Sequence, residues 1–156
     1  MSAEHRSSPR LVAGLVRTAL GLYWAGLFVA THLPNPPVVV PRDVSDTWLH
    51  FLAYLGLATL LVPAISLPGS ISRWTGLVAW GVAAVYATID ELLQMIPVLH
   101  RTAEWKDWFA DLGGAGCGVL IGALIARTWL SSRGREAEGP SVDALHRRSP
   151  DTLEDG

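Results

Sequence analysis

The sequence contains a single cysteine, Cys117, so the chain cannot form an internal disulfide. Because Cys117 lies among glycines in an apolar segment, we interpret it as a small packing residue. Charged residues are scarce, at 17% of the chain, and the formal net charge is -2. Without a basic face to displace counterions from phosphates, the chain is not expected to bind nucleic acid. The nucleophile motif G-x-S-x-G is absent as well, so no serine nucleophile is identified.

Apolar residues, in contrast, make up 50% of the 156 residues, and the mean hydropathy is +0.32. They are gathered in four segments, each long enough for a helix that crosses a membrane. The segments are 11–33, 48–67, 74–96 and 108–130. We therefore predict an all-α fold, a four-helix transmembrane bundle, because a helix satisfies its own backbone hydrogen bonds in lipid. The membrane domain would comprise residues 11–130, between a disordered segment, 1–10, and a disordered tail, 131–156.

The basic residues predict the orientation of the four helices. A larger group flanks one side of the arrangement, and a smaller group flanks the other. The first group is Arg6, Arg10, Arg17, Arg73, Arg127, Arg133 and Arg135, and the second is Arg42, Arg101 and Lys106. Cytoplasmic loops carry the excess of arginine and lysine, so both termini are expected to be cytoplasmic. A cleavable signal peptide over the first segment is the alternative, but the bulky Phe28 occupies the place of a small residue near the expected cleavage site.

Polar residues interrupt the apolar segments along three helical stripes. Residues three or four apart share one face of a helix, and each stripe has this spacing. The stripes are Asp46, His50 and Tyr54; Tyr86, Asp90 and Gln94; and Asp107, Asp111, Gly114, Gly118 and Gly122. In the predicted topology their acids and His50 fall in the outer part of the membrane, with Asp90 about 9 Å below the interface. We therefore predict an outward-facing polar site, a water-accessible vestibule to which several helices contribute.

His50 and two neighbouring acids are the candidates for chemistry at this site. His50 can be a general base, a metal ligand or a buried hydrogen-bonding residue. Asp90 and Glu91 point about 100° apart on a helix, so one can face the vestibule while the other caps a helix or pairs with Arg101. Two acids and one histidine could also hold a divalent metal, although the sequence alone identifies no metal site and no cofactor.

Other polar residues have competing interpretations. Arg101 can clamp a phosphate or carboxylate with its planar guanidinium, or hold its loop through a salt bridge to Glu91 or Asp107. Asp107 can bind a ligand, or it can be the N-cap of the fourth helix. Tyr54 and Gln94 are expected to support the site by hydrogen bonding.

Three glycines on the last stripe follow the GxxxG spacing. Gly114, Gly118 and Gly122 let another helix approach the backbone of the fourth helix closely. That helix can belong to the same chain or to a second copy, so the spacing allows both internal packing and a homo-oligomer.

Four motifs follow one another between Asp46 and Gly122. They are Asp46-x3-His50-Phe51-x2-Tyr54, then Asp90-Glu91-x2-Gln94, then Arg101, and finally Asp107 with Gly114 and Gly118. In this order and spacing they resemble the VanZ-like family of small multispanning membrane proteins, named for a teicoplanin-resistance protein. The resemblance implies a protein of the bacterial cytoplasmic membrane with a link to glycopeptide resistance, and it implies no reaction. Thr47 replaces the lysine of the family and Asp111 its asparagine, so this site is more acidic, and a shared ligand would bind differently or through a metal.

Three hypotheses about function follow. The first is a binding protein for an envelope lipid, a lipid-linked precursor or a lipoglycopeptide, and we favour it because no catalytic set is recognisable. Its ligand-binding residues would be Asp46, His50, Tyr54, Glu91, Gln94, Arg101 and Asp107. The second is a membrane-embedded hydrolase or transferase for a phosphate-bearing lipid, with His50 and either Asp90 or Glu91 as acid and base. The third is a structural bundle whose polar residues only fix the helix register.

Overall fold

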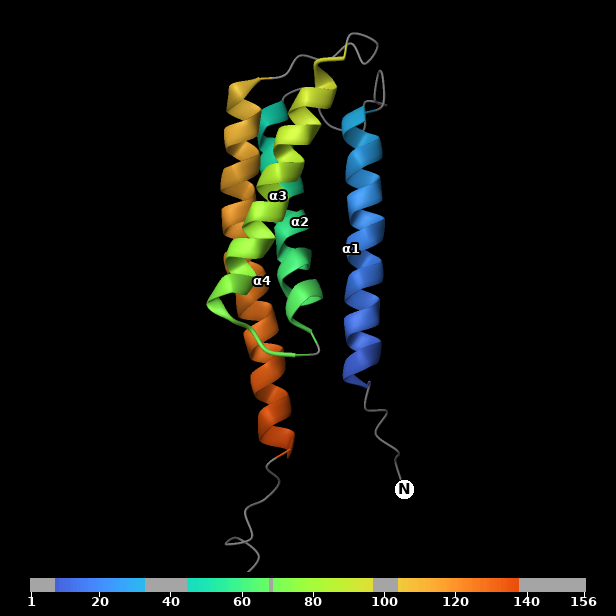
Figure 1. Ribbon diagram of the computed structural model, residues 1–156, viewed down its shortest axis with the longest axis vertical. Coiled ribbons are helices and arrows are strands. Elements are labelled where there is room, and N and C mark those ends of the chain that lie inside the picture. The colour runs from blue at the N-terminus through green and yellow to red at the C-terminus, as the bar shows by residue number, and fades with distance from the viewer. Residues whose placement is uncertain (1–7, 33–44, 68, 97–103, 138–156) are drawn as a thin grey trace, which may run out of the picture.

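The structure, a computed structural model, describes residues 8–32, 45–67, 69–96 and 104–137. Within these ranges it contains four helices and no strand. The helices are α1 (Pro9–His32), α2 (Asp46–Ser66), α3 (Arg73–Gln94) and α4 (Trp105–Ala137), shown in Figure 1. Each helix is long and apolar enough to cross a membrane. The predicted all-α four-helix bundle is therefore confirmed, and its helices mark the chain as an integral membrane protein.

The first helix begins earlier than predicted. α1 starts at Pro9, so Pro9 and Arg10 are helical rather than disordered. Ser8 explains this start, because its Oγ accepts a hydrogen bond from the Leu11 N–H at 3.2 Å, and proline is favoured in the first turn. The rest of that predicted segment, 1–7, lies outside the described residues.

The last helix ends later than predicted. α4 continues to Ala137, so residues 131–137 of the predicted disordered tail are helical. A contact one turn apart supports this extension, because the Arg133 guanidinium lies 4.8 Å from the centre of the Trp129 ring. The remainder of the predicted tail, 138–156, lies outside the described residues.

Successive helices run in opposite directions, so each end of the bundle combines two helix starts with two helix ends (Figure 1). The start of α1 and the end of α4 lie together at the lower end of Figure 1, with the end of α2 and the start of α3. The opposite end, which we call the polar end, comprises the last turns of α1 and α3 and the first turns of α2 and α4. The residues that mark it are His32, Asp46, Gln94 and Trp105.

Glycines place the backbone of α4 directly against α2. A Cβ atom on Gly114 would collide with the carbonyl of Phe51, and one on Gly118 would collide with the carbonyl of Leu55. Gly122 faces α2 in the same way. The predicted packing face is therefore used inside the chain, and a second copy would need another surface.

Polar side chains attach α1 to its neighbour. At the lower end Arg17 donates hydrogen bonds to the carbonyls of Ala64 and Leu67, at 3.2 and 2.9 Å, where α2 ends. Further along, the Tyr23 hydroxyl donates to the Ala53 carbonyl at 2.9 Å. A cation at the end of a helix is favourable, because the last carbonyls lack partners within the helix.

The outer surface of the bundle is apolar, as expected of helices that face lipid. Leu22, Leu120 and Leu124 are among its large exposed side chains. Cys117 is also exposed on this surface, so the interpretation of Cys117 as a packing residue is wrong.

Candidate functional site

His50 and Asp111 form the centre of the polar end. His50 comes from α2 and Asp111 from α4, and the Nδ1 atom of His50 lies 3.0 Å from Oδ1 of Asp111. Both side chains are buried, with 6% and 0% of their surface exposed. A carboxylate at this distance fixes the orientation of the imidazole ring. The structure therefore pairs His50, the predicted general base, with Asp111, which shares a face of α4 with Gly114, Gly118 and Gly122.

Glu91 reaches the same pair from α3. Its carboxylate, a ring nitrogen of His50 and an oxygen of Asp111 all lie within 4.8 Å of one another. We call His50, Glu91 and Asp111 the His50 cluster. The Oε2 atom of Glu91 accepts a hydrogen bond from the backbone N–H of Glu104 at 3.2 Å, whereas Glu91 Oε1 and Asp111 Oδ2 accept none from the described residues. Three helices thus bring together two buried carboxylates and an imidazole.

Asp46 and Asp107 form a second group with the same histidine. One ligand atom from each of Asp46, His50 and Asp107 lies within 4.8 Å of the others. The Oδ1 atom of Asp107 accepts a hydrogen bond from the Thr47 hydroxyl at 2.7 Å. α4 begins at Trp105, so Asp107 lies inside the first turn, and the N-cap interpretation of Asp107 is wrong. Its negative charge is nevertheless favourable there, near the N-terminus of a helix.

Asp90 faces α1 instead of the His50 cluster. Its Oδ1 atom accepts a hydrogen bond from the Thr31 hydroxyl at 2.8 Å and lies 3.7 Å from Nδ1 of His32. Its Oδ2 atom accepts a hydrogen bond from the Gln94 amide at 3.2 Å. Asp90 and Glu91 therefore have different partners, as their spacing along the helix predicts. The sequence analysis did not identify Thr31 and His32 as partners of Asp90. Their position as two adjacent polar residues at the end of an apolar segment could have indicated such a role.

Two further predicted site residues are Tyr54 and Arg101. Tyr54 lies one turn beyond His50 on α2, is fully buried, and its hydroxyl has no hydrogen-bond partner among the described residues. Arg101 lies outside the described residues, so its predicted role as an anion clamp stays a prediction. Among the described lysines and arginines, only Lys106 lies at the polar end, where it forms an ion pair with Glu104 at 2.7 Å.

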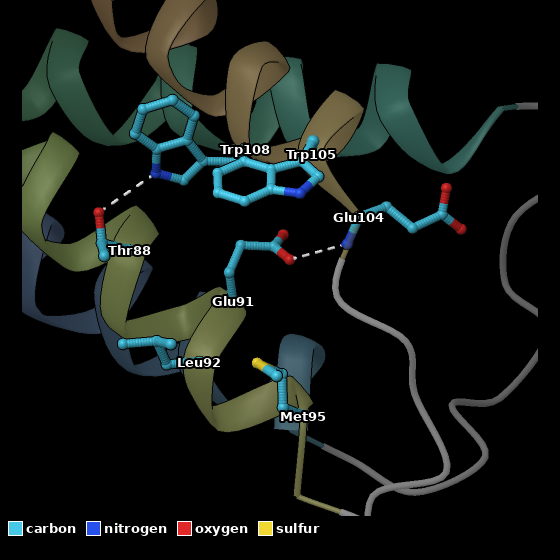
Figure 2. Close-up of a pocket in the computed structure, with 7 residues that line it drawn as sticks. All are labelled: Thr88, Glu91, Leu92, Met95, Glu104, Trp105 and Trp108. Atoms are coloured by element: carbon cyan, nitrogen blue, oxygen red, sulfur yellow. Dashed lines mark hydrogen bonds between the residues drawn. The ribbon is translucent and has the colours of Figure 1, made fainter.

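A pocket opens between α3 and the start of α4, next to the His50 cluster (Figure 2). Its volume is about 290 Å³. The lining residues are Thr88, Glu91, Leu92, Met95, Glu104, Trp105 and Trp108. In Figure 2 Glu91 points from α3 toward the two tryptophans, and the Trp108 Nε1–H donates a hydrogen bond to the Thr88 hydroxyl at 3.2 Å. The pocket thus combines apolar walls with a carboxylate that also belongs to the His50 cluster.

This arrangement has two chemical capacities. The oriented imidazole of His50, with Glu91 close by, can take part in proton transfer. Each of the two groups that share His50 offers one nitrogen and two carboxylate oxygens, a donor set that can hold a divalent cation.

Comparison of the chain with family models, curated proteins and solved structures found no match.

Proposed function

We propose that the protein binds an amphipathic molecule of the bacterial cell envelope in the pocket between α3 and α4. The ligand would be an envelope lipid, a lipid-linked precursor or a lipoglycopeptide. One observation carries this proposal: the pocket has apolar walls at the outer surface of the bundle and a buried carboxylate, Glu91, on its inner side. Such a pocket suits a molecule with an apolar chain and a polar head.

Two walls of the pocket lie on the exposed surface of the bundle. Leu92 and Trp105 are 59% and 79% exposed, although both side chains are apolar. Tryptophan is enriched where a membrane meets water, and Trp105 lies at the first residue of α4. A ligand already in the membrane could therefore enter sideways, with its chain along these residues and its head toward Glu91.

The charge of the polar end restricts the head group. Within the described residues its carboxylates outnumber its single lysine, Lys106, which is already paired with Glu104. Toward the described residues, a head that presents an amine or hydroxyl donors is therefore better matched than a bare anion, because like charges repel, whereas the predicted anion clamp Arg101 lies outside these residues. Glu91 Oε1 has no donor among the described residues, so in the ion-free protein it could accept a hydrogen bond from such a head.

The distribution of arginine supports an outward-facing pocket in the cytoplasmic membrane. At the described positions, arginines lie at or toward the end opposite the pocket, in keeping with cytoplasmic termini. They are Arg10, Arg17, Arg73, Arg127, Arg133 and Arg135. The VanZ-like resemblance of residues 46–122 adds the link to glycopeptides such as teicoplanin, which in this orientation would reach the pocket from outside the cell.

Native mass spectrometry of the detergent-purified chain tests this proposal. The double variant Leu92→Ala/Trp105→Ala removes two apolar walls of the pocket, and we expect the retained lipid or added lipoglycopeptide to fall about fivefold or more. Leu120→Ala is the matched control, because Leu120 is 72% exposed on α4 but does not line the pocket. Equal retention by the wild type and both variants would contradict the proposal.

The His50 cluster also favours a second candidate function, a hydrolase or transferase acting on a phosphate-bearing lipid. His50 is oriented by Asp111 at 3.0 Å and has Glu91 close by, which is the arrangement of a base with a neighbouring acid. Asp90, the other predicted catalytic acid, is held by Thr31 and Gln94 and does not join them. Turnover of such a lipid by purified wild-type protein, lost in His50→Ala, would favour this function over binding alone.

A further inference from the structure

Two buried carboxylate oxygens in the His50 cluster lack hydrogen-bond donors among the described residues. They are Oε1 of Glu91, whose side chain is 8% exposed, and Oδ2 of the fully buried Asp111. The hydroxyl of Tyr54, one turn from His50, is buried as well and has no hydrogen-bond partner within the part of the chain that the structure describes. Buried polar groups are normally satisfied, and buried charges are normally paired or bound to a metal. The cluster therefore presents acceptors for which the described protein supplies no donor.

We propose that His50, Glu91 and Asp111 bind a divalent first-row transition-metal ion such as Zn²⁺ or Mn²⁺. One imidazole nitrogen and two carboxylate oxygens form a mixed donor set of the kind that these ions accept, whereas Ca²⁺ and Mg²⁺ prefer oxygen alone. The atoms are already gathered, since one from each residue lies within 4.8 Å of the others. His50 Nδ1 and Asp111 Oδ1 are hydrogen bonded at 3.0 Å, so an ion that takes both atoms as ligands would replace the proton between them.

Asp46 and Asp107 make a weaker set with the same histidine. Asp107 Oδ1 is already occupied by the Thr47 hydroxyl at 2.7 Å, and Asp46 is exposed to water. Glu91 and Asp111, in contrast, are both buried, and each has one oxygen that accepts no hydrogen bond from the residues described. Both groups of ligands include His50, so a single ion would use one group. The buried group, His50 with Glu91 and Asp111, is the better site.

The ion would join three helices, because its ligands come from α2, α3 and α4. Binding should therefore raise the melting temperature of the protein. Glu91 also lines the pocket, so the ion could offer a coordination position to the head group of a bound amphiphile. That second role rests on the proposed function, whereas binding of the ion does not.

Metal loading of the tag-free, full-length protein in detergent tests the proposal. The protein is stripped with a chelator, incubated with Zn²⁺, desalted and analysed for zinc, and its Zn²⁺ affinity is measured by calorimetry. We expect about one zinc per chain for the wild type, and affinity at least about tenfold weaker for Glu91→Gln and Asp111→Asn. Both variants keep the size of the side chain, and circular dichroism checks their fold. Asp46→Asn and Asp107→Asn are the comparison variants, and each should lose less affinity than Glu91→Gln or Asp111→Asn because it removes no proposed ligand.

Two results would overturn this assignment. One is a wild-type protein that retains no zinc after loading and whose melting temperature Zn²⁺ does not raise. The other is loss of zinc from Asp107→Asn while Glu91→Gln keeps it, which would move the ion to the exposed set. The pocket variant Leu92→Ala/Trp105→Ala separates the two proposals, because it should lose the amphiphile and keep zinc. A wild type that binds zinc but no amphiphile refutes the proposed function alone, and one that binds an amphiphile but no zinc refutes the ion site alone.

Discussion

The contact between α2 and α4 changes in character along its length. In its glycine-rich half, Gly118 brings the backbone of α4 against the carbonyl of Leu55, and the Thr59 hydroxyl of α2 donates a hydrogen bond to the Gly118 carbonyl at 3.3 Å. At the polar end the same two helices meet through His50 and Asp111, and an oxygen of Asp111 stays without a hydrogen bond from the described residues. An unsatisfied buried group costs about 1–3 kcal/mol. The glycine half is therefore built for close packing, whereas the polar end is built from buried polar side chains that need partners.

The largest expected loss of stability follows from changing the glycine-rich half of the contact between α2 and α4. Gly118→Ala places a Cβ atom against the Leu55 carbonyl and should lower the free energy of unfolding by about 3 kcal/mol. Gly81→Ala is the control, because a Cβ there meets nothing within 4 Å, and it should not destabilise the protein. Unfolding curves in detergent measure both. Equal losses in the two variants would mean that α4 does not depend on this close approach.

The next effect tests whether the buried pair of His50 and Asp111 stabilises the polar end. Asp111→Leu removes one partner of a buried pair and should cost about 2 kcal/mol of unfolding free energy, because His50 loses its acceptor. The double variant His50→Leu/Asp111→Leu replaces the pair with apolar groups, so its stability should return to within about 1 kcal/mol of the wild type. If the pair itself made a net contribution to stability, the double variant would instead lose at least as much stability as Asp111→Leu.

A smaller effect is expected at the end of the bundle opposite the site. Arg17→Gln weakens the hydrogen bonds to the last carbonyls of α2 and should cost about 1 kcal/mol of unfolding free energy. Because Arg17 lies far from the pocket, retention of an amphiphile should not change. Loss of the amphiphile in this variant, with the helices still folded, would show that the two ends are coupled.

The smallest effect on stability is expected at the pocket wall. Trp105 is largely exposed at the start of α4, so Trp105→Ala should change the free energy of unfolding by less than about 0.5 kcal/mol. The same unfolding curves measure this change. A loss well above that value would assign Trp105 a structural role instead of a place in a ligand pocket.

The sequence predicted the helices well because their main signal is local. A membrane-crossing helix needs a long apolar segment, and each of the four segments meets that requirement without reference to the others. The ends were less predictable, since they depend on individual contacts. Ser8 caps α1 before the expected start, and Arg133 on Trp129 extends α4 beyond the expected end.

The site was predictable along each helix but not between helices. Spacing placed Asp46 with His50 and Asp107 with Asp111, and alternating helix direction placed these pairs at one end. Which side chains meet depends on how the helices are rotated about their axes, and periodicity does not fix that rotation. For this reason the pairing of Asp90 with Thr31, and the choice of Glu91 for the His50 cluster, came only from the structure.

The central claim is that the polar end of the bundle receives an amphiphile from the membrane. Photo-crosslinking in cells tests this most directly, with a benzophenone amino acid placed at Met95, which lines the pocket, or at Leu120, which does not. We predict an adduct at Met95 that is enriched over the bulk lipids, absent at Leu120, and lost when Glu91→Gln is added. The same distribution of lipid adducts at both positions, unchanged by Glu91→Gln, would contradict the claim.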